Sequence, residues 1–160
     1  MKKTTSIRFL LLVACACVAV SCAKNDDGGD RADLLAGTRW QATLIDENPE
    51  TSPRDGYGEW NSLYYPWQDC HMDDTFTFKN SNFFIDDNGS VCEGGVDLIF
   101  EKSSQSYTYD EASKQLLIGT GEDAVRLQVY ELTETRLKIG AMLPPGAATY
   151  DHLIFLFKRK

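Results

Sequence analysis

Polar and apolar residues alternate along much of the chain after residue 37, and this period of two is typical of β-strands that bury one face. The alternation is clearest in residues 124–132 and 136–143. Short groups of turn residues, rich in Gly, Pro, Asp and Asn, separate such segments. The pattern predicts strands over residues 38–45, 74–78, 82–85, 96–101, 106–109, 116–120, 124–132, 136–143 and 150–158, with a hairpin signal at Asn88-Gly89.

One short helix is predicted before these strands, over residues 31–36, and the Gly37 that follows it is a typical helix stop signal. Short strands joined by short turns, with no long helix to cross over, favour an antiparallel up-and-down meander. Such a meander either stacks as a sandwich or closes as a barrel, and closure removes exposed edges. We therefore expect an all-β fold, a barrel of about eight strands with a short N-terminal helix.

The N-terminus carries the features of an export signal. Lys2, Lys3 and Arg8 precede an apolar run that is too short and wrongly flanked for a membrane-spanning helix. The run ends in Ala-Val-Ser-Cys, which resembles a bacterial lipobox. We expect a signal peptide over residues 1–21 and a lipidated Cys22 that holds the protein on a membrane. The alternative is a buried or free cysteine that happens to follow an apolar run.

Residues 22–31 are polar and contain glycine, so they are predicted to form a flexible tether before a folded domain over residues 32–160. The acids that follow Lys24, just behind Cys22, resemble the signal by which Bacteroidetes send lipoproteins to the outer face of the outer membrane. An ordinary solvated linker explains the same residues. The expected location is the outer membrane, with the domain facing the periplasm or the cell surface.

The charge of the chain argues against a nucleic-acid partner. The 160 residues contain 16 Lys and Arg against 24 Asp and Glu, a net charge of −8. Loss of three basic residues and no acidic ones with residues 1–21 leaves 13 against 24, or −11. Binding to phosphates needs a clustered basic surface, which this composition does not supply.

Two cysteines remain once Cys15 and Cys17 leave with the signal peptide and Cys22 carries lipid. Export places Cys70 and Cys92 in an oxidising compartment, so we expect a disulfide between them. A metal site is the alternative, because several further candidate ligands surround Cys70 in the sequence Asp-Cys-His-Met-Asp-Asp. The usual Cys and His spacings of a metal site are missing, and no metal is expected.

Motifs of catalysis and of cofactor binding are absent from the sequence. A Ser or Cys nucleophile would need His71 or His152 as its base, and Cys70 and Cys92 are expected to be bonded to each other. Adjacent acids beside turns, such as Asp73 with Asp74, are typical of solvated surface. We therefore expect no enzyme and no cofactor.

The connection over residues 46–69 is unusually long at 24 residues, and long connections usually have a function or structure of their own. It holds five aromatic residues, Tyr57, Trp60, Tyr64, Tyr65 and Trp67. The last four are the candidate ligand-binding residues, as a lid over a cavity or as a stacking platform for a sugar. In the alternative interpretation they pack on the barrel wall or cap its end.

Several short motifs resemble, in their order and spacing, the lipocalin-like lipoproteins of Bacteroidetes. They are the helix leading into Gly37-Thr38-Arg39-Trp40, the segments 70–78 and 89–92, Tyr109-Asp110 before 116–118, and the hairpin 130–137. The resemblance spans roughly residues 32–158 and implies a lipocalin-like up-and-down barrel, in which the connection after the first strand lies at the open mouth. Lipocalins proper have Gly-x-Trp at the first strand, so the orientation of Trp40 does not carry over.

Two functions follow as hypotheses. In the first, a membrane-anchored lipocalin-like barrel binds a small apolar or amphipathic ligand in a pocket. In the second, the aromatic connection forms a patch for a glycan or a protein and the barrel holds no ligand. Bulky residues are expected inside the barrel and would leave little room for a ligand: Phe76, Phe78, Leu98, Phe100, Leu153, Phe155 and Phe157.

Overall fold

The computed structural model describes residues 31–89, 104–146 and 148–160. The predicted signal peptide, Cys22, the tether before residue 31, the strand over 96–101 and Cys92 lie outside these residues. The elements are α1 (Arg31–Gly37), β1 (Arg39–Ala42), η1 (Pro49–Thr51), β2 (Ser62–Tyr64), η2 (Asp69–His71), β3 (Thr75–Lys79), β4 (Asn82–Asp86), β5 (Ser104–Asp110), β6 (Gln115–Ile118), η3 (Gly121–Asp123), β7 (Val125–Leu132), β8 (Arg136–Met142) and β9 (His152–Arg159).

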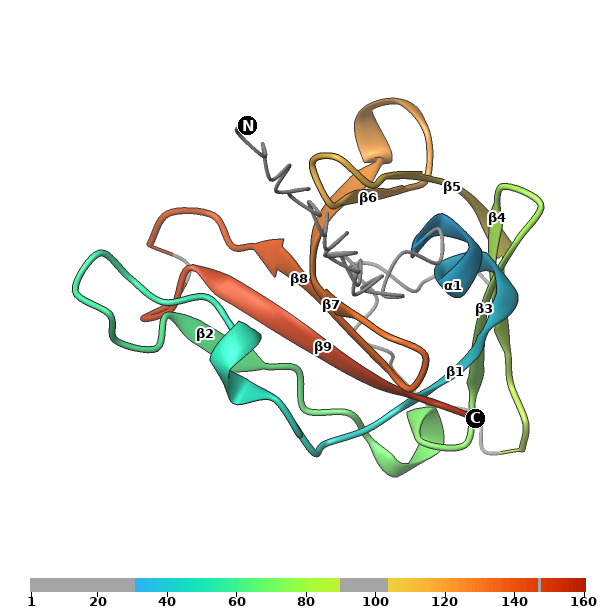
Figure 1. Ribbon diagram of the computed structural model, residues 1–160, viewed down its shortest axis with the longest axis horizontal. Helices are drawn as coiled ribbons and strands as arrows, with labels where there is room; N and C mark the ends of the chain where they lie inside the picture. Colours follow the sequence, from blue (N-terminus) through green and yellow to red (C-terminus); the bar gives the residue numbers. More distant parts are fainter. Residues whose placement is uncertain (1–30, 90–103, 147) are drawn as a thin grey trace, which may run out of the picture.

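Eight antiparallel strands form a closed barrel. They follow the order β1-β3-β4-β5-β6-β7-β8-β9, and β9 pairs with β1 to complete the ring. Figure 1 shows this ring, with α1 lying across one end of it. The predicted all-β meander, its closure into a barrel of about eight strands and its short N-terminal helix are confirmed.

The barrel interior is filled by the apolar face of each strand. Phe155 and Phe157 from β9 pack with Phe76 from β3, and Trp40 at the start of β1 is fully buried. At the end covered by α1, Leu35 enters the same core. Phe78 and Leu153 of the predicted interior set also belong to this cluster or pack against it. These contacts confirm the expected inner face for the described strands.

The strand β2 was not predicted, and among the described strands it alone pairs in parallel. β1 and β2 pair with the same edge of β9, β2 with its first residues and β1 with its last. Leu63 lies opposite Leu153 and Tyr64 opposite Ile154. In Figure 1, β2 and the connection from β8 to β9 extend sideways from the barrel. Because β9 is longer than the part that β1 covers, its free edge has room for a second partner.

The connection from β1 to β2 differs from the expected position at the barrel mouth. Residues 43–52, which we call the strap, run along the outer wall of the barrel. Thr43 N donates to Leu156 O at 3.0 Å, and Lys138 reaches the strap from the outer face of β8. The alternation over residues 136–143 assigns Lys138 to the polar, solvent-facing side of its strand, yet it is 2% exposed. The strap covers it, which a strand-by-strand interpretation of the sequence does not anticipate.

The turn at Asn88-Gly89 does not produce a tight hairpin between neighbouring strands of the barrel. β4 pairs with β5, which begins only at Ser104. The Asn88 side chain instead donates to Asp73 O and Thr75 Oγ1, at 3.0 and 2.9 Å. Among the described residues, no helix is long and apolar enough to cross a membrane.

Candidate functional site

Among the described residues, the most buried charged side chain is that of Lys138, beneath the strap. Its Nζ donates to Asp46 Oδ2 at 2.7 Å, to Asn48 O at 2.7 Å and to Ser52 Oγ at 3.0 Å. Tyr64 Oη also donates to Asp46 Oδ2, at 2.6 Å. Burial opposes ionisation of Asp46, but the hydrogen bonds from Lys138, Tyr64 and Asn48 hold the pKa of this carboxyl below its ordinary value.

The same contacts explain why Ser52 and Lys138 do not make a nucleophile with its base. A lysine base needs a free lone pair, whereas three acceptors surround Nζ and take the three protons of an ammonium group. Ser52 is 4% exposed, so a substrate has no access to its hydroxyl. This cluster therefore fastens the strap to the barrel wall.

A second group of ion pairs joins the strap to β7 and β8. Arg136 Nε donates to Glu131 Oε1 at 2.8 Å, and Arg136 Nη1 lies 3.2 Å from Glu47 Oε2. A groove of about 350 Å³ runs along this region. Most of its charged groups are already paired with one another, which leaves little for a ligand.

The structure separates the four aromatic residues that were predicted to bind a ligand. Tyr65 and Trp67 are 8% and 6% exposed and belong to the core. The Trp67 ring lies 5.4 Å from that of Phe157 and 5.6 Å from that of Phe76. The Tyr65 ring lies 5.0 Å from that of Phe155. These two rings fill one end of the barrel.

Trp60 and Tyr64 lie outside the barrel and apart from that pair. Trp60 is 42% exposed, and the guanidinium of Arg54 lies over its ring at 3.7 Å. Tyr64 is tied by its hydroxyl to Asp46. The four rings therefore do not form one surface, and their contact with a ligand stays a prediction.

A different groove lies on the outer face of β6, β7, β8 and β9. It has a volume of about 540 Å³, within the usual range of small-molecule sites. One lining residue, Leu127, belongs to the core. The other lining residues are Gln115, Arg126, Gln128, Tyr130, Gly140, Met142 and His152. None of the described residues that line it is acidic.

Tyr130 owes its place in this groove to an irregularity in β7. The register between β7 and β8 shifts between Val129 and Glu131, so Tyr130 is the extra residue of a β-bulge. Its ring lies over Gly140, where an added Cβ would come within 2.7 Å of Tyr130 Cε2. Its hydroxyl lies 3.0 Å from His152 Nδ1. Burial raises the pKa of Tyr130.

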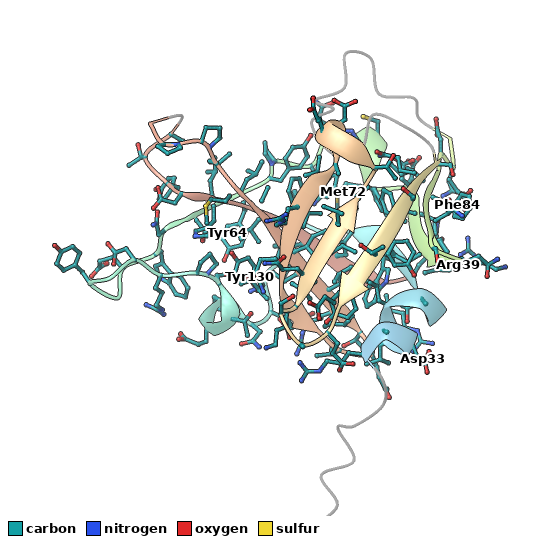
Figure 2. All side chains as sticks on the ribbon, turned by 90° about the horizontal axis from the view of Figure 1, so that it is seen from above. Asp33, Arg39, Tyr64, Met72, Phe84 and Tyr130 are labelled. Carbon is teal, nitrogen blue, oxygen red and sulfur yellow. The ribbon has the colours of Figure 1, made fainter. Side chains whose placement is uncertain are left out.

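Figure 2 shows that Tyr130 and Tyr64 both lie on the side of the barrel from which β2 extends. The register places Gly140 opposite Ile154, and Ile154 opposite Tyr64. The outer face is therefore continuous from Tyr130 across two strands to Tyr64. The sequence contained one signal of this site, because a glycine inside a strand pattern often marks the close approach of another group.

The acidic residues around Cys70 were the alternative metal ligands in the sequence, and they lie in and after η2. Asp74 is 7% exposed, and burial together with the charges of Asp87 and Asp73 raises its pKa to about 6. Lys160 donates to Asp73 O and Thr75 Oγ1 beside it. In the part of the chain that the structure describes, no group of three His, Cys, Asp or Glu is arranged to hold a metal ion.

The other predicted site residues are placed as follows. Cys70 lies in η2, and its predicted partner Cys92 lies outside the described residues, so the disulfide stays a prediction. The ring of His71 lies 5.6 Å from that of Trp67. His152 belongs to the outer groove.

Comparison with protein families matches residues 35–139 to a lipocalin-like domain. No curated protein and no solved structure matches the chain. The matched residues include the first seven strands of the described fold and half of β8.

Proposed function

Because the chain belongs to the lipocalin-like domain family, we propose that it is a membrane-tethered binding protein for a small amphipathic molecule. We assign the ligand to the groove on the outer face of β6–β9. The observation that carries this proposal is the close approach of the Tyr130 ring to Gly140, with its hydroxyl beside His152, which provides an apolar floor with polar groups at its edge.

The packing of the barrel supports a ligand site on its outside. A barrel of eight strands has room for its own side chains or for one small ligand. Here Trp67 contacts Phe76, Phe155 and Phe157, and Tyr65 packs beside it. A ligand between these rings would have to displace side chains that stabilise the core.

The test first identifies the bound molecule and then locates its binding site. Native mass spectrometry of the protein purified from its own host detects small molecules that stay bound. The ligand found is then titrated into two variants, Tyr130→Ala in the groove and Trp67→Phe in the interior. We expect Tyr130→Ala to weaken binding about tenfold or more and Trp67→Phe to leave it unchanged. The reverse pattern would place the ligand inside the barrel and overturn the assignment.

The membrane tether is the second part of the proposal, and the lipobox-like residues before Cys22 support it. Metabolic labelling with an alkyne fatty acid should mark the wild-type protein and Cys70→Ser, and should not mark Cys22→Ser. Retained label in Cys22→Ser would contradict the tether. The same residues support export and the outer membrane as the location, and the resemblance to lipoproteins of Bacteroidetes agrees with it.

A glycan- or protein-binding surface is the second candidate function. The exposure of Tyr57 and Trp60, at 94% and 42%, favours it. We rank it second because Arg54 covers one face of the Trp60 ring, and a sugar would need that flat surface. Binding, rather than catalysis, is proposed in both cases, since Ser52, which accepts a hydrogen bond from Lys138, is buried under the strap.

A further inference from the structure

We infer that the outer groove is selective for amphiphiles with an anionic head group, and that Arg126 binds this group. The inference rests on the proposed function and adds the charge of the ligand to it. The occupant is a soluble single molecule, such as a medium-chain carboxylate, with its chain on Tyr130 and Met142. A neutral amphiphile of the same length would occupy the groove more weakly.

The charge of the groove differs from that of the chain as a whole. The chain has eight more acidic than basic residues, yet the described lining of the groove holds Arg126 and His152 and no acid. Arg126 is exposed, and among the described residues it takes part in no ion pair. An unpaired guanidinium can bind a carboxylate through two parallel hydrogen bonds.

Two acidic side chains outside the groove form hydrogen bonds of their own: Asp110, which lines a neighbouring pocket together with Arg126, and Asp151, which precedes His152 in the chain. Asp110 accepts hydrogen bonds from Ser113 Oγ at 2.7 Å and from Ala112 N at 2.9 Å, and these bonds lower its pKa. Asp151 Oδ2 accepts from Asn61 Nδ2 at 2.7 Å. Both carboxylates keep their charge, but among the described residues neither forms an ion pair with Arg126.

The apolar part of the ligand has a surface next to Arg126. Met142 is 76% exposed and lines the groove, and its register partner on β9 is His152. On the other side, Leu117 of β6 is the register partner of Arg126. A methionine is unbranched and adapts to a flexible chain. The exposed Met142 side chain in the same groove as the unpaired guanidinium of Arg126 matches a molecule that has an apolar chain and one anionic end.

The test compares two ligands that differ in charge alone. Decanoate and decan-1-ol, both kept below the concentration at which they aggregate, are titrated into the purified protein by calorimetry. The methyl resonance of Met142 reports whether each one occupies the groove. We expect decanoate to bind more tightly than decanol. Arg126→Gln should weaken decanoate at least tenfold and leave decanol unchanged.

The matched control is Lys79→Gln, which removes one exposed positive charge from β3, across the barrel from β7. It should leave both affinities as they are. If both ligands bind the wild type equally and Arg126→Gln changes neither, the anionic preference is overturned while the proposed function stands. If neither ligand binds the wild type, the proposed function fails as well.

A final arm separates a free amphiphile from a membrane lipid. Sedimentation with phosphatidylcholine vesicles, with and without phosphatidylglycerol, should show no dependence on Arg126. Binding that depends on Arg126 with anionic vesicles and not with decanoate would overturn the inference.

Discussion

At the scale of single residues, burial rather than residue type decides what the aromatic side chains of the long connection do. Trp67 lies among phenylalanine rings in the core, whereas Trp60, seven positions earlier, lies on the surface against Arg54. The same side chain therefore stabilises the fold at one position and is available for contacts at the other.

Trp67→Ala should lower the free energy of unfolding by about 3 to 5 kcal/mol, because it removes a buried ring and leaves a cavity. Trp60→Ala should cost less than about 1 kcal/mol, since its ring is already partly solvated. Urea denaturation of both variants measures the difference. Equal losses would contradict the packing described for Trp67.

Asp74 is predicted to make stability depend on pH. Burial, with the charges of Asp87 and Asp73, raises its pKa from 3.8 to about 6. A folded-state pKa above the unfolded one means that the native protein binds the proton more tightly. The contribution of this group to stability therefore increases as the pH falls from about 7 towards 4.

Asp74→Asn removes this dependence. The variant should be more stable than the wild type at pH 7.5, and the advantage should shrink at pH 4.5. Asp123→Asn, an exposed position in η3, serves as the control. Thermal unfolding at the two pH values tests it, and an advantage that grows on acidification would refute the assignment.

At the scale of elements, two contacts between segments determine the outer wall of the barrel. The strap is fastened by Lys138, whose Nζ donates to three acceptors at 3.0 Å or less. The groove depends on the β-bulge at Tyr130 and on the absence of a side chain at Gly140.

Lys138→Met should destabilise the protein by about 3 kcal/mol. The change leaves the partly buried Asp46 without its charged partner, and the loss of one member of a buried pair typically costs about this much. Arg54→Met breaks an exposed ion pair with Glu50 and should cost less than about 1 kcal/mol. Chemical denaturation distinguishes the two, and comparable losses would contradict a structural role for the strap.

Gly140→Ala should cost about 1 to 3 kcal/mol through overpacking. The new Cβ would approach both Tyr130 Cε2 and Ile154 Cδ1 to 2.7 Å, so the Tyr130 ring has to move. Gly56→Ala, with no atom within 4 Å of the added Cβ, is the matched control. Thermal unfolding gives the cost, and tyrosine ring resonances report the movement. A Gly140→Ala variant as stable as the control would show that the contact is loose.

At the scale of the whole molecule, closure of the sheet is the main organising feature. β9 pairs with β8 along most of its length on one side, and with β1 and β2 on the other. The last strand of the chain therefore joins the first to the rest of the barrel. A disulfide between Cys70 and Cys92 would add a covalent link between η2 and the connection that follows β4.

Denatured, unreduced protein lacking its signal peptide is predicted to show no free thiol, because export favours the bond between the two remaining cysteines. Cys70→Ser should expose one thiol to a colourimetric reagent under the same conditions. In the chain-entropy treatment, reduction of a loop of this size costs roughly 3 kcal/mol of stability. Two reactive thiols in the unreduced wild type would refute the pairing.

The sequence by itself determined the fold class, because the period of two in β7 and β8 identifies them as strands and marks the face that enters the core. It also indicated the closed meander, since short turns between strands leave few other ways to bury one face of each. Local patterns of this kind depend on neighbours within a few residues, and they are visible without coordinates.

Only the tertiary structure decided which residues form the strap contacts and the proposed groove. Lys138 and Asp46 are 92 positions apart, and their pairing depends on the path of the strap across the wall. The groove needs Tyr130, Gly140 and His152 from three strands, one of them shifted by a bulge. The physical reason is that burial and contact at these positions come from segments distant in sequence, whose approach is set by the closed barrel.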